Sequence, residues 1–282
     1  MPQLTWLITG CSSGFGEQFV SSILARGDHV IATGRDIIKL QNLKEAGASI
    51  LQLDITSTQQ AINETVAQAI SIYGKVDVLL NNAGYVSTGI FEDLAYEDFL
   101  AQFETNIFGT IKVTQALLPQ FRQRRAGTMV FIGSLSGWMG DPGISAYVGS
   151  KFALEGIVES LWRETSPLGI KTLLIEPGRF RTKLLSSGNM KTVSTEILEY
   201  KDFSRTLLKG LAEADQMQPG DPIKLVEMVL DLVRQEGIAE GKEIPFRLPL
   251  GSDCYNDVKA KCEETLELLK KWEPMIKSTD YE

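Results

Sequence analysis

A tyrosine and a lysine stand four residues apart in the segment "ISAYVGSKFALEG", at Tyr147 and Lys151. In a helix, side chains with this spacing share one face. A free phenol has a pKa of about 10, and a neighbouring cation favours the phenolate and lowers that value. The pair therefore has the chemistry of a catalytic acid/base. Tyr255 and Lys259 repeat the spacing in "YNDVK", so the surrounding sequence must decide between the two pairs.

A glycine-rich turn near the start of the chain has the chemistry of a phosphate site. In "LTWLITGCSSGFGEQFV", Gly10, Gly14 and Gly16 follow a strand-like segment and open a helix-like one. Gly10 can make the tight turn, Gly14 lets the backbone approach a pyrophosphate, and Gly16 allows close helix–strand contact. The helix N-terminus then offers free N–H groups to the phosphates. An ordinary strand–helix turn is the alternative interpretation.

The elements that must position these residues alternate along the chain. Short apolar runs predict buried strands, and the segments between them carry helical periodicity. Such alternation implies a parallel sheet with helices on both faces. We therefore predict one α/β domain over residues 1–282, a doubly wound parallel sheet of about seven strands. The strands are expected at 4–9, 29–33, 49–54, 76–84, 128–133, 170–178 and 244–248, and the clearest helices at 17–26, 58–73 and 146–168.

Two segments depart from this alternation. Residues 183–220 have mixed polarity and few strand signals, and are expected to be an inserted substrate loop with one or two helices that covers the pocket. Residues 249–282 form a helical extension after the sheet is complete. The leucines and the tryptophan of its amphipathic pattern are expected to be docking contacts.

Composition excludes several classes of function. The formal net charge is −8, which argues against nucleic acid or an anionic membrane as a partner. Three widely spaced cysteines and a single histidine give no disulfide framework and no metal-ligand set. No apolar run reaches the length of a membrane span, and the start of the chain lacks the basic residues of a signal peptide. We expect a cytoplasmic protein without a metal ion.

An ordered set of motifs over about residues 4–182 resembles the short-chain dehydrogenase/reductase family, in its compact single-domain branch. The motifs are "TGCSSGFG", "LDIT", "NNAG", "TNIFG", "IGSLSG", "YVGSK" and "EPGRFRT". Each is weak alone, and their order makes the set specific. The pattern is similar to members that resemble retinol and hydroxysteroid dehydrogenases. It implies a Rossmann fold, a nicotinamide cofactor and a homo-oligomer, either a dimer or a tetramer.

The resemblance makes Tyr147 and Lys151 the catalytic pair and adds Ser134 and Asn106. Hydride arriving at a carbonyl carbon leaves negative charge on oxygen, which needs a hydrogen-bond donor and then a proton. By resemblance, Ser134 holds the carbonyl oxygen, Tyr147 supplies the proton, Lys151 also binds the nicotinamide ribose, and Asn106 anchors a proton-relaying water. Ser136 is the rival of Ser134. The second tyrosine–lysine pair follows no serine loop and is assigned no chemistry.

The end of the second strand bears on the choice of cofactor. An NAD site usually places an acidic residue there to bind the adenosine ribose, whereas this chain has Gly34 followed by Arg35. A guanidinium can hold a 2′-phosphate, so NADP(H) is favoured over NAD(H). Asp36 is expected to cap the next helix; if it binds ribose instead, the cofactor is NAD. The resemblance implies further cofactor contacts from Gly10, Ser12, Ser13, Gly14, Phe15, Gly16, Asp54, Ile55, Asn82, Ala83, Gly84, Pro177, Gly178 and Thr182, besides Tyr147 and Lys151.

The substrate is indicated only by class. The segment after Ser134 should border the pocket, where Trp138 suggests an apolar wall beside Ser134 and Tyr147. The resemblance implies hydride transfer to or from a carbonyl or secondary alcohol of medium size. Two alternatives remain open: a non-redox enzyme of the same fold, such as an isomerase, cyclase or dehydratase, and a regulatory protein that binds NADP(H) without turnover.

Overall fold

The computed structural model describes residues 2–186 and 190–281. Within them a parallel sheet of seven strands runs in the order β3-β2-β1-β4-β6-β7-β9. The strand order reverses between β1 and β4, which is the switch point where ligands bind in open α/β sheets. The strands are β1 Thr5–Ile8, β2 His29–Gly34, β3 Ser49–Gln52, β4 Val78–Asn81, β6 Gly127–Ile132, β7 Ile170–Pro177 and β9 Arg247–Leu250.

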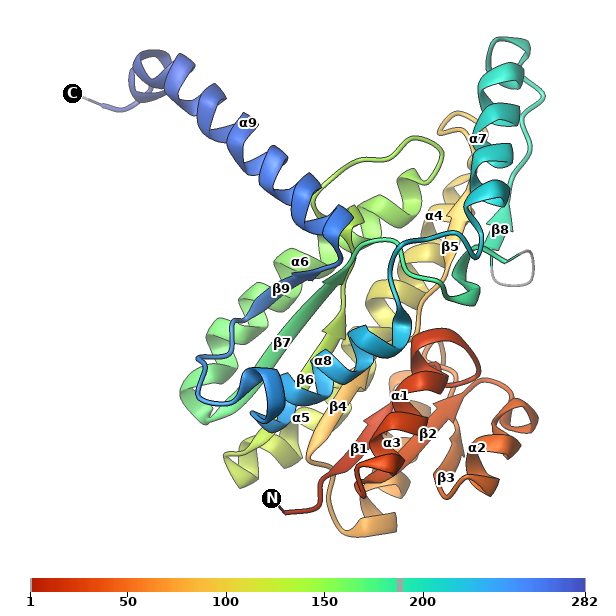
Figure 1. Ribbon diagram of the computed structural model, residues 1–282, viewed down its shortest axis with the longest axis vertical. Coiled ribbons are helices and arrows are strands. Elements are labelled where there is room, and N and C mark those ends of the chain that lie inside the picture. Colours follow the sequence, from red (N-terminus) through yellow and green to blue (C-terminus); the bar gives the residue numbers. More distant parts are fainter. Residues whose placement is uncertain (1, 187–189, 282) are drawn as a thin grey trace.

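Helices cover both faces of this sheet, as Figure 1 shows. One face packs on α1 and α8, with α2 at its edge, and the other packs on α3, α5 and α6. Successive residues of β1 serve opposite faces: Trp6 and Ile8 belong to the first core and Leu7 to the second. The helices are α1 Gly14–Ala25, α2 Gln41–Glu45, α3 Gln59–Tyr73, α4 Tyr96–Phe103, α5 Thr110–Arg124, α6 Ser145–Thr165, α7 Lys201–Ala214, α8 Pro222–Arg234 and α9 Ser252–Lys277.

Local sequence explains where several helices begin and end. The Thr58 hydroxyl accepts a hydrogen bond from the Ala61 N–H and caps α3, which stops at Gly74 in the left-handed conformation. Asp221 caps α8, and Pro222 follows at its first position. Both starts use side-chain acceptors for otherwise free N–H groups. The expected helices and strands are found within a few residues of their predicted bounds.

Two short strands lie outside the predicted set. Val86–Thr88 (β5) pairs in parallel with Met190–Thr192 (β8). They tie the segment after β4 to the chain that leads into α7, and α7 stands with them at one corner of the molecule in Figure 1. The insertion is thus fastened to the body on one side.

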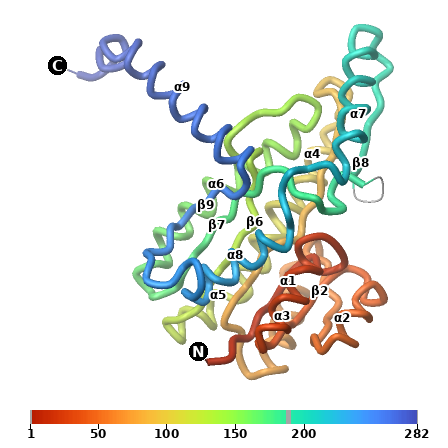
Figure 2. Tube along the Cα trace, in the orientation of Figure 1, coloured from red at the N-terminus to blue at the C-terminus, as the bar shows by residue number. Residues whose placement is uncertain are grey.

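Helix α9 projects away from the sheet, as the tube in Figure 2 shows most clearly. Cys254, in its first turn, is buried, whereas Leu266, Leu269 and Trp272 are exposed. The expected docking of these side chains is therefore not found within the described part of the chain. Beyond Val258 the described side chains of the helix are all exposed, so its apolar side chains there pack against no surface formed by the described residues.

Candidate active site

The glycine-rich turn forms a close-fitting cradle between β1 and α1. Gly10 and Gly14 have positive φ angles of 72° and 61°, a region that side chains disfavour. A Cβ at Gly16 would overlap the carbonyl oxygen of Gly10. Ser13 occupies the N-cap of α1, but its side chain caps none of the helix N–H groups. The cradle therefore presents free backbone donors to an anion, as a pyrophosphate site requires.

A threonine that the sequence interpretation passed over fixes this cradle. The Thr9 hydroxyl accepts hydrogen bonds from the backbone N–H of Asn82 at 3.0 Å and of Ala83 at 3.1 Å. The Asn82 side chain donates in turn to the carbonyls of Thr9 and Gly10, both at 3.0 Å. These bonds join the ends of β1 and β4 across the switch point. The signal was present in the sequence as the threonine that precedes Gly10.

Asn106 lies in a π-helical turn, Glu104–Gly109, between α4 and α5. Its Nδ2 donates to the Ser150 hydroxyl at 3.0 Å, and its Oδ1 accepts from the Tyr85 N–H at 3.2 Å. A Cβ at Gly84 would lie 3.2 Å from that Oδ1. Asn106 therefore links the segment after β4 to helix α6, and π turns of this kind are frequent at functional sites.

Ser134, Tyr147 and Lys151 meet at the carboxyl end of β6. The Ser134 hydroxyl is close enough to the Tyr147 phenol to act on its pKa, and it accepts a hydrogen bond from the Ser136 N–H at 3.0 Å. The Lys151 ammonium donates to the Ile132 carbonyl at 2.7 Å and lies 5.7 Å from the centroid of the Tyr147 ring. Ser134, rather than its rival Ser136, is the serine that faces the phenol.

Burial is the largest cause of the pKa shifts of both Tyr147 and Lys151. It raises the pKa of the Tyr147 phenol above 10, although the hydrogen bond from Ser134 opposes the shift. It lowers the pKa of Lys151 to about 8, against the attraction of Glu155. The net shift of the Tyr147 pKa in this structure is therefore upward, with burial as its largest cause. The ammonium is directed to the Ile132 carbonyl, and desolvation of a phenolate outweighs the neighbouring groups.

The second tyrosine–lysine pair lies elsewhere. Tyr255 is mostly exposed near the start of α9, and Lys259 forms an exposed ion pair with Glu263 at 3.7 Å. Solvent-exposed pairs of this kind contribute little. The structure gives this pair none of the burial that surrounds Tyr147.

The residues expected around an adenosine lie along the ends of β2 and β3. Arg35 is exposed beyond β2, and the Asp36 carboxylate accepts from the Ile38 N–H at 3.0 Å, capping a short 3₁₀ helix, Ile37–Leu40. Asp54 accepts from both the N–H and the hydroxyl of Thr56. Ile55 is buried beneath the π turn. Asp36 is thus engaged as the cap that the sequence predicted.

The residues expected near the nicotinamide and pyrophosphate form the opposite wall of the cradle. Phe15 packs edge-to-face on Phe180, with ring centroids 5.6 Å apart. A Cβ at Gly14 would lie 3.6 Å from the Thr182 Cβ, so the Gly178–Thr182 segment lies against the glycine turn. Pro177 ends β7, Gly178 donates its N–H to the Leu250 carbonyl, and Ser12 is exposed.

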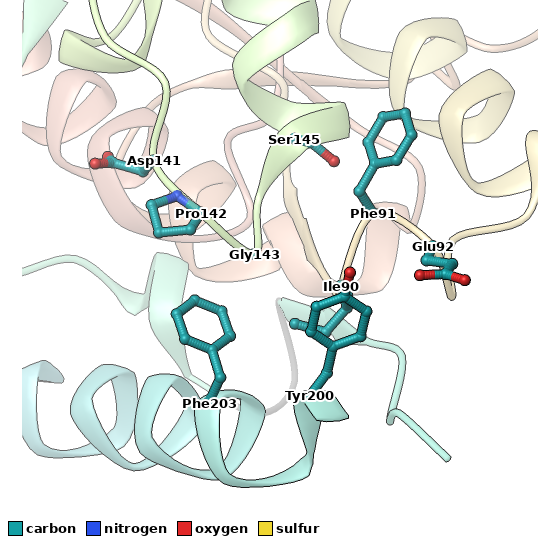
Figure 3. Close-up of a pocket in the computed structure, with 9 residues that line it drawn as sticks. All are labelled: Ile90, Phe91, Glu92, Asp141, Pro142, Gly143, Ser145, Tyr200 and Phe203. Carbon is teal, nitrogen blue, oxygen red and sulfur yellow. The ribbon is translucent and has the colours of Figure 1, made fainter. Parts of the chain in front are cut away.

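A cavity of about 730 Å³ opens beside the start of α6. Figure 3 shows Tyr200 and Phe203, from the insertion, rising toward Phe91 and Pro142 on the other side. Ser145, two residues before Tyr147, reaches its wall. None of the four expected catalytic residues lines it. Its lining residues are Ile90, Phe91, Glu92, Asp141, Pro142, Gly143, Ser145, Tyr200 and Phe203.

The structure places Trp138 away from this cavity. Its indole stacks under the Arg247 guanidinium, 5.0 Å from the ring centroid, and Trp138 is absent from the cavity lining. The aromatic side chains that line this cavity are Phe91 and, from the insertion, Tyr200 and Phe203. The partner of Trp138 lies 109 residues later in the chain, on a strand whose neighbours the local sequence does not specify.

Within residues 2–186 and 190–281, no group of three or more histidine, cysteine, aspartate or glutamate side chains is arranged to hold a metal ion. Over the same residues, no helix combines the length and apolar character needed to cross a bilayer.

Comparison with known proteins identifies the family. Residues 5–192 match the sequence profile described as short chain dehydrogenase. The chain belongs to the short-chain dehydrogenase/reductase family. It is 36% identical over 255 residues to the "Uncharacterized oxidoreductase YusZ" of Bacillus subtilis, covering 87% of this chain and 88% of that protein. It is 38% identical over 244 residues to human "Retinol dehydrogenase 8", covering 82% and 78%.

Solved structures of the family agree with the fold. A short-chain dehydrogenase from Streptomyces avermitilis superposes with a TM-score of 0.87 at 36% identity, covering 99% of this chain and all of that one. Like these relatives, the protein is an oxidoreductase with a doubly wound Rossmann sheet.

Proposed function

We propose that this oxidoreductase transfers hydride between NADP(H) and a carbonyl or secondary alcohol of a medium-sized apolar substrate. One observation carries the proposal: a buried serine–tyrosine–lysine cluster, Ser134, Tyr147 and Lys151, stands at the edge of the sheet that also holds a glycine cradle. The serine–tyrosine–lysine cluster can bind a carbonyl oxygen and protonate it, and the glycine cradle can hold a dinucleotide.

The residues of the cradle fit a dinucleotide. Overlap at Gly16 excludes any side chain there, and the uncapped N-terminus of α1 offers N–H donors to a pyrophosphate. Asn82, Ala83 and Gly84 would flank the adenosine ribose, and Lys151 the nicotinamide ribose. When bound, the nicotinamide supplies or accepts the hydride.

The titration of Tyr147 fits a proton donor. Its raised pKa keeps the phenol protonated at neutral pH, so it can protonate a carbonyl oxygen that the Ser134 hydroxyl holds. In the opposite direction the phenol must first lose its proton, and that becomes easier as pH rises. The protonated phenol is the form that carbonyl reduction requires. Asn106 would hold the proton-relaying water beside Lys151.

The preference for NADP(H) rests on the end of β2. Gly34 offers no carboxylate, Asp36 is engaged in capping, and Arg35 is exposed and available. Changing Arg35 to alanine should weaken NADPH binding by about 10- to 150-fold, the equivalent of about 1.5–3 kcal/mol for a hydrogen bond to a charged group. NADH binding should be unchanged, because NADH lacks the phosphate.

The matched control is Arg163→Ala, which removes an exposed arginine that pairs with Glu159 on α6. It should leave both dissociation constants unchanged at fixed salt, because it lies outside the cradle. Tighter binding of NADH than of NADPH by the wild type, or equal weakening of both by Arg35→Ala, would make NAD the cofactor.

The substrate class is supported by the cavity beside α6. Ile90, Phe91, Tyr200 and Phe203 make its walls apolar, and the carboxylates of Glu92 and Asp141 disfavour an anion. The relative named as a retinol dehydrogenase fits an apolar alcohol of this size. Steady-state rates of NADPH oxidation should be higher with an apolar ketone than with a keto acid of equal length.

A matched variant tests the cavity itself. Phe203→Ser should raise KM for the apolar ketone by about tenfold or more, since burying a phenyl ring is worth about 1.5–3 kcal/mol. Phe152→Ser, at an exposed phenylalanine on α6 outside the cavity lining, is the control. Equal KM values in both variants would place the substrate elsewhere.

The same assay separates the two alternatives. A regulatory protein would bind NADPH but consume none with any substrate. A non-redox enzyme would change its substrate without net oxidation of NADPH. We also propose a cytoplasmic homo-oligomer, with the location supported by three cysteines that are all free thiols.

A further inference from the structure

Two buried acidic side chains and a half-buried arginine lie together directly beneath the Ser134 loop. Glu155 comes from α6, Glu176 from β7 and Arg247 from β9. Glu155 is almost fully buried and Glu176 fully buried. The Arg247 Nη2 lies 2.8 Å from Glu155 Oε2, and its Nε lies 3.0 Å from Glu176 Oε1. One guanidinium thus faces two carboxyl groups.

The two carboxyl groups face the same guanidinium, and none of their four oxygens has a hydrogen-bond partner of good geometry among the described residues. The Glu176 carboxyl group is close enough to act on the ionisation of Glu155, both as a charge and as a potential hydrogen-bond partner. Ionised carboxylates are acceptors only, so this contact is a hydrogen bond only when one of the two carries a proton. Burial and the Glu176 carboxylate together raise the pKa of Glu155 to about 9. The proton of the pair is therefore carried by Glu155, with the Glu176 carboxylate as its acceptor.

The acid pair supports the loop that carries Ser134. Gly133 and Gly137 stand on either side of that serine, and a Cβ on them would lie 2.9 Å and 2.8 Å from Glu155 Oε1. The backbone of the loop therefore rests on the Glu155 carboxyl group. Lys151 lies one helical turn before Glu155 on α6, and its charge interacts with that carboxyl group.

We propose that Glu155 and Glu176 share a single proton and act as positioning residues, which hold the Ser134 loop and the Lys151 ammonium in place from below. The proposal deepens the proposed function and rests on it for its effect on turnover. One proton and one guanidinium leave the pair and Arg247 neutral together, so Lys151 is the remaining charge beside the phenol. The other titratable or charged groups around the pair are Lys151 and Glu159 on α6, Arg247 on β9 and Cys254 on α9.

The shared proton has a consequence for unfolding that does not depend on activity. In the unfolded chain Glu155 has an ordinary pKa of about 4.3, whereas in the fold its pKa is raised. The stabilisation is therefore complete below the unfolded value and is lost as pH rises toward the folded value. Between these limits one bound proton changes the unfolding equilibrium constant by about tenfold per pH unit.

The first experiment compares wild type with Glu155→Gln, whose amide donates to Glu176 as the protonated acid does but cannot titrate. Urea unfolding is measured between about pH 5.5 and 8.5. The ratio of the wild-type unfolding constant to that of the variant should rise by about tenfold per pH unit. Glu159→Gln, on the same helix and 4.0 Å from Arg247, is the control and should keep the wild-type slope. A Glu155→Gln slope equal to the wild-type slope would overturn the shared proton, whether or not any substrate has been found.

The second experiment measures positioning through turnover. Glu155→Gln should keep kcat within about threefold of wild type at pH 7, and Glu155→Ala should lower it by about tenfold or more, because only alanine removes the side chain on which the loop glycines rest. NADPH affinity should be similar in both variants. Above about pH 9 the wild type should lose kcat relative to Glu155→Gln, because ionised Glu155 is repelled by the Glu176 carboxylate and no longer supports the Ser134 loop from below. Equal kcat in the alanine and glutamine variants, or identical pH profiles in wild type and Glu155→Gln, would overturn the positioning role.

Discussion

Replacing Thr9 with valine tests whether a single hydroxyl holds the cofactor cradle together. Valine keeps the shape of threonine and removes the acceptor for two backbone donors, the N–H groups of Asn82 and Ala83. An unsatisfied buried donor costs about 1–3 kcal/mol. Asn82 and Ala83 are only partly buried, so water can reach their N–H groups. The lower end of the range, about 1 kcal/mol, therefore applies to each of the two donors. Thr9→Val should therefore destabilise the protein by about 2 kcal/mol and weaken NADPH binding, because the same segment also anchors Gly10.

The control uses the same chemical change at another buried site. Thr172 is buried in β7, and its hydroxyl has no hydrogen-bond partner among the described residues. Thr172→Val should therefore be neutral or slightly stabilising. Urea unfolding gives the stability of each variant, and NADPH fluorescence titration gives the affinity. If Thr9→Val is as stable as Thr172→Val and binds NADPH like the wild type, Thr9 does not hold the cradle.

Three further predictions concern other parts of the chain. Gly16→Ala should abolish NADPH binding, measured by the same titration, because its Cβ would overlap the Gly10 carbonyl; unchanged affinity would contradict the proposed cradle. Arg234→Met should lower the free energy of unfolding by about 3–5 kcal/mol, since it leaves the buried Asp28 carboxylate without its ion-pair partner; a loss below about 1 kcal/mol would show that water reaches that carboxylate. A thiol reagent should modify Cys262 alone in the native protein, because the other two cysteines are buried and burial raises the pKa of each thiol to about 12; rapid labelling of a second thiol would contradict this burial.

The sheet could be predicted because its signals are local. The apolar run of β1 and the glycines that follow it predict a strand, a turn and a helix within a dozen residues. The capping role of Asp36 and the contrast between Tyr147 and Tyr255 also followed from neighbouring sequence. A helix or strand that buries one face shows a periodic pattern of apolar residues in the sequence, and this pattern can be recognised without coordinates.

The rest depends on contacts between segments distant in the chain. Strands β5 and β8 have three residues each and pair across about a hundred residues, so neither shows a periodic pattern. Trp138 faces Arg247 rather than the cavity for the same reason. The upward shift of the Tyr147 pKa also could not be predicted from the sequence. Its main cause is burial, and the burial of a side chain depends on all the elements that pack around it. Glu155 and Glu176 read as ordinary charged residues until the fold places them together.

The central claim is that Tyr147 is the acid of a ketone reductase, and one variant tests it most directly. The measurement is the single-turnover rate of NADPH oxidation by Tyr147→Phe with an apolar ketone, alongside NADPH affinity, with Tyr255→Phe as the control. General acid catalysis contributes about 10²–10⁴-fold, so Tyr147→Phe should bind NADPH normally and lose at least about 100-fold in rate, while Tyr255→Phe matches the wild type. A Tyr147→Phe variant that retains the wild-type rate, or an equal loss in Tyr255→Phe, would contradict the account.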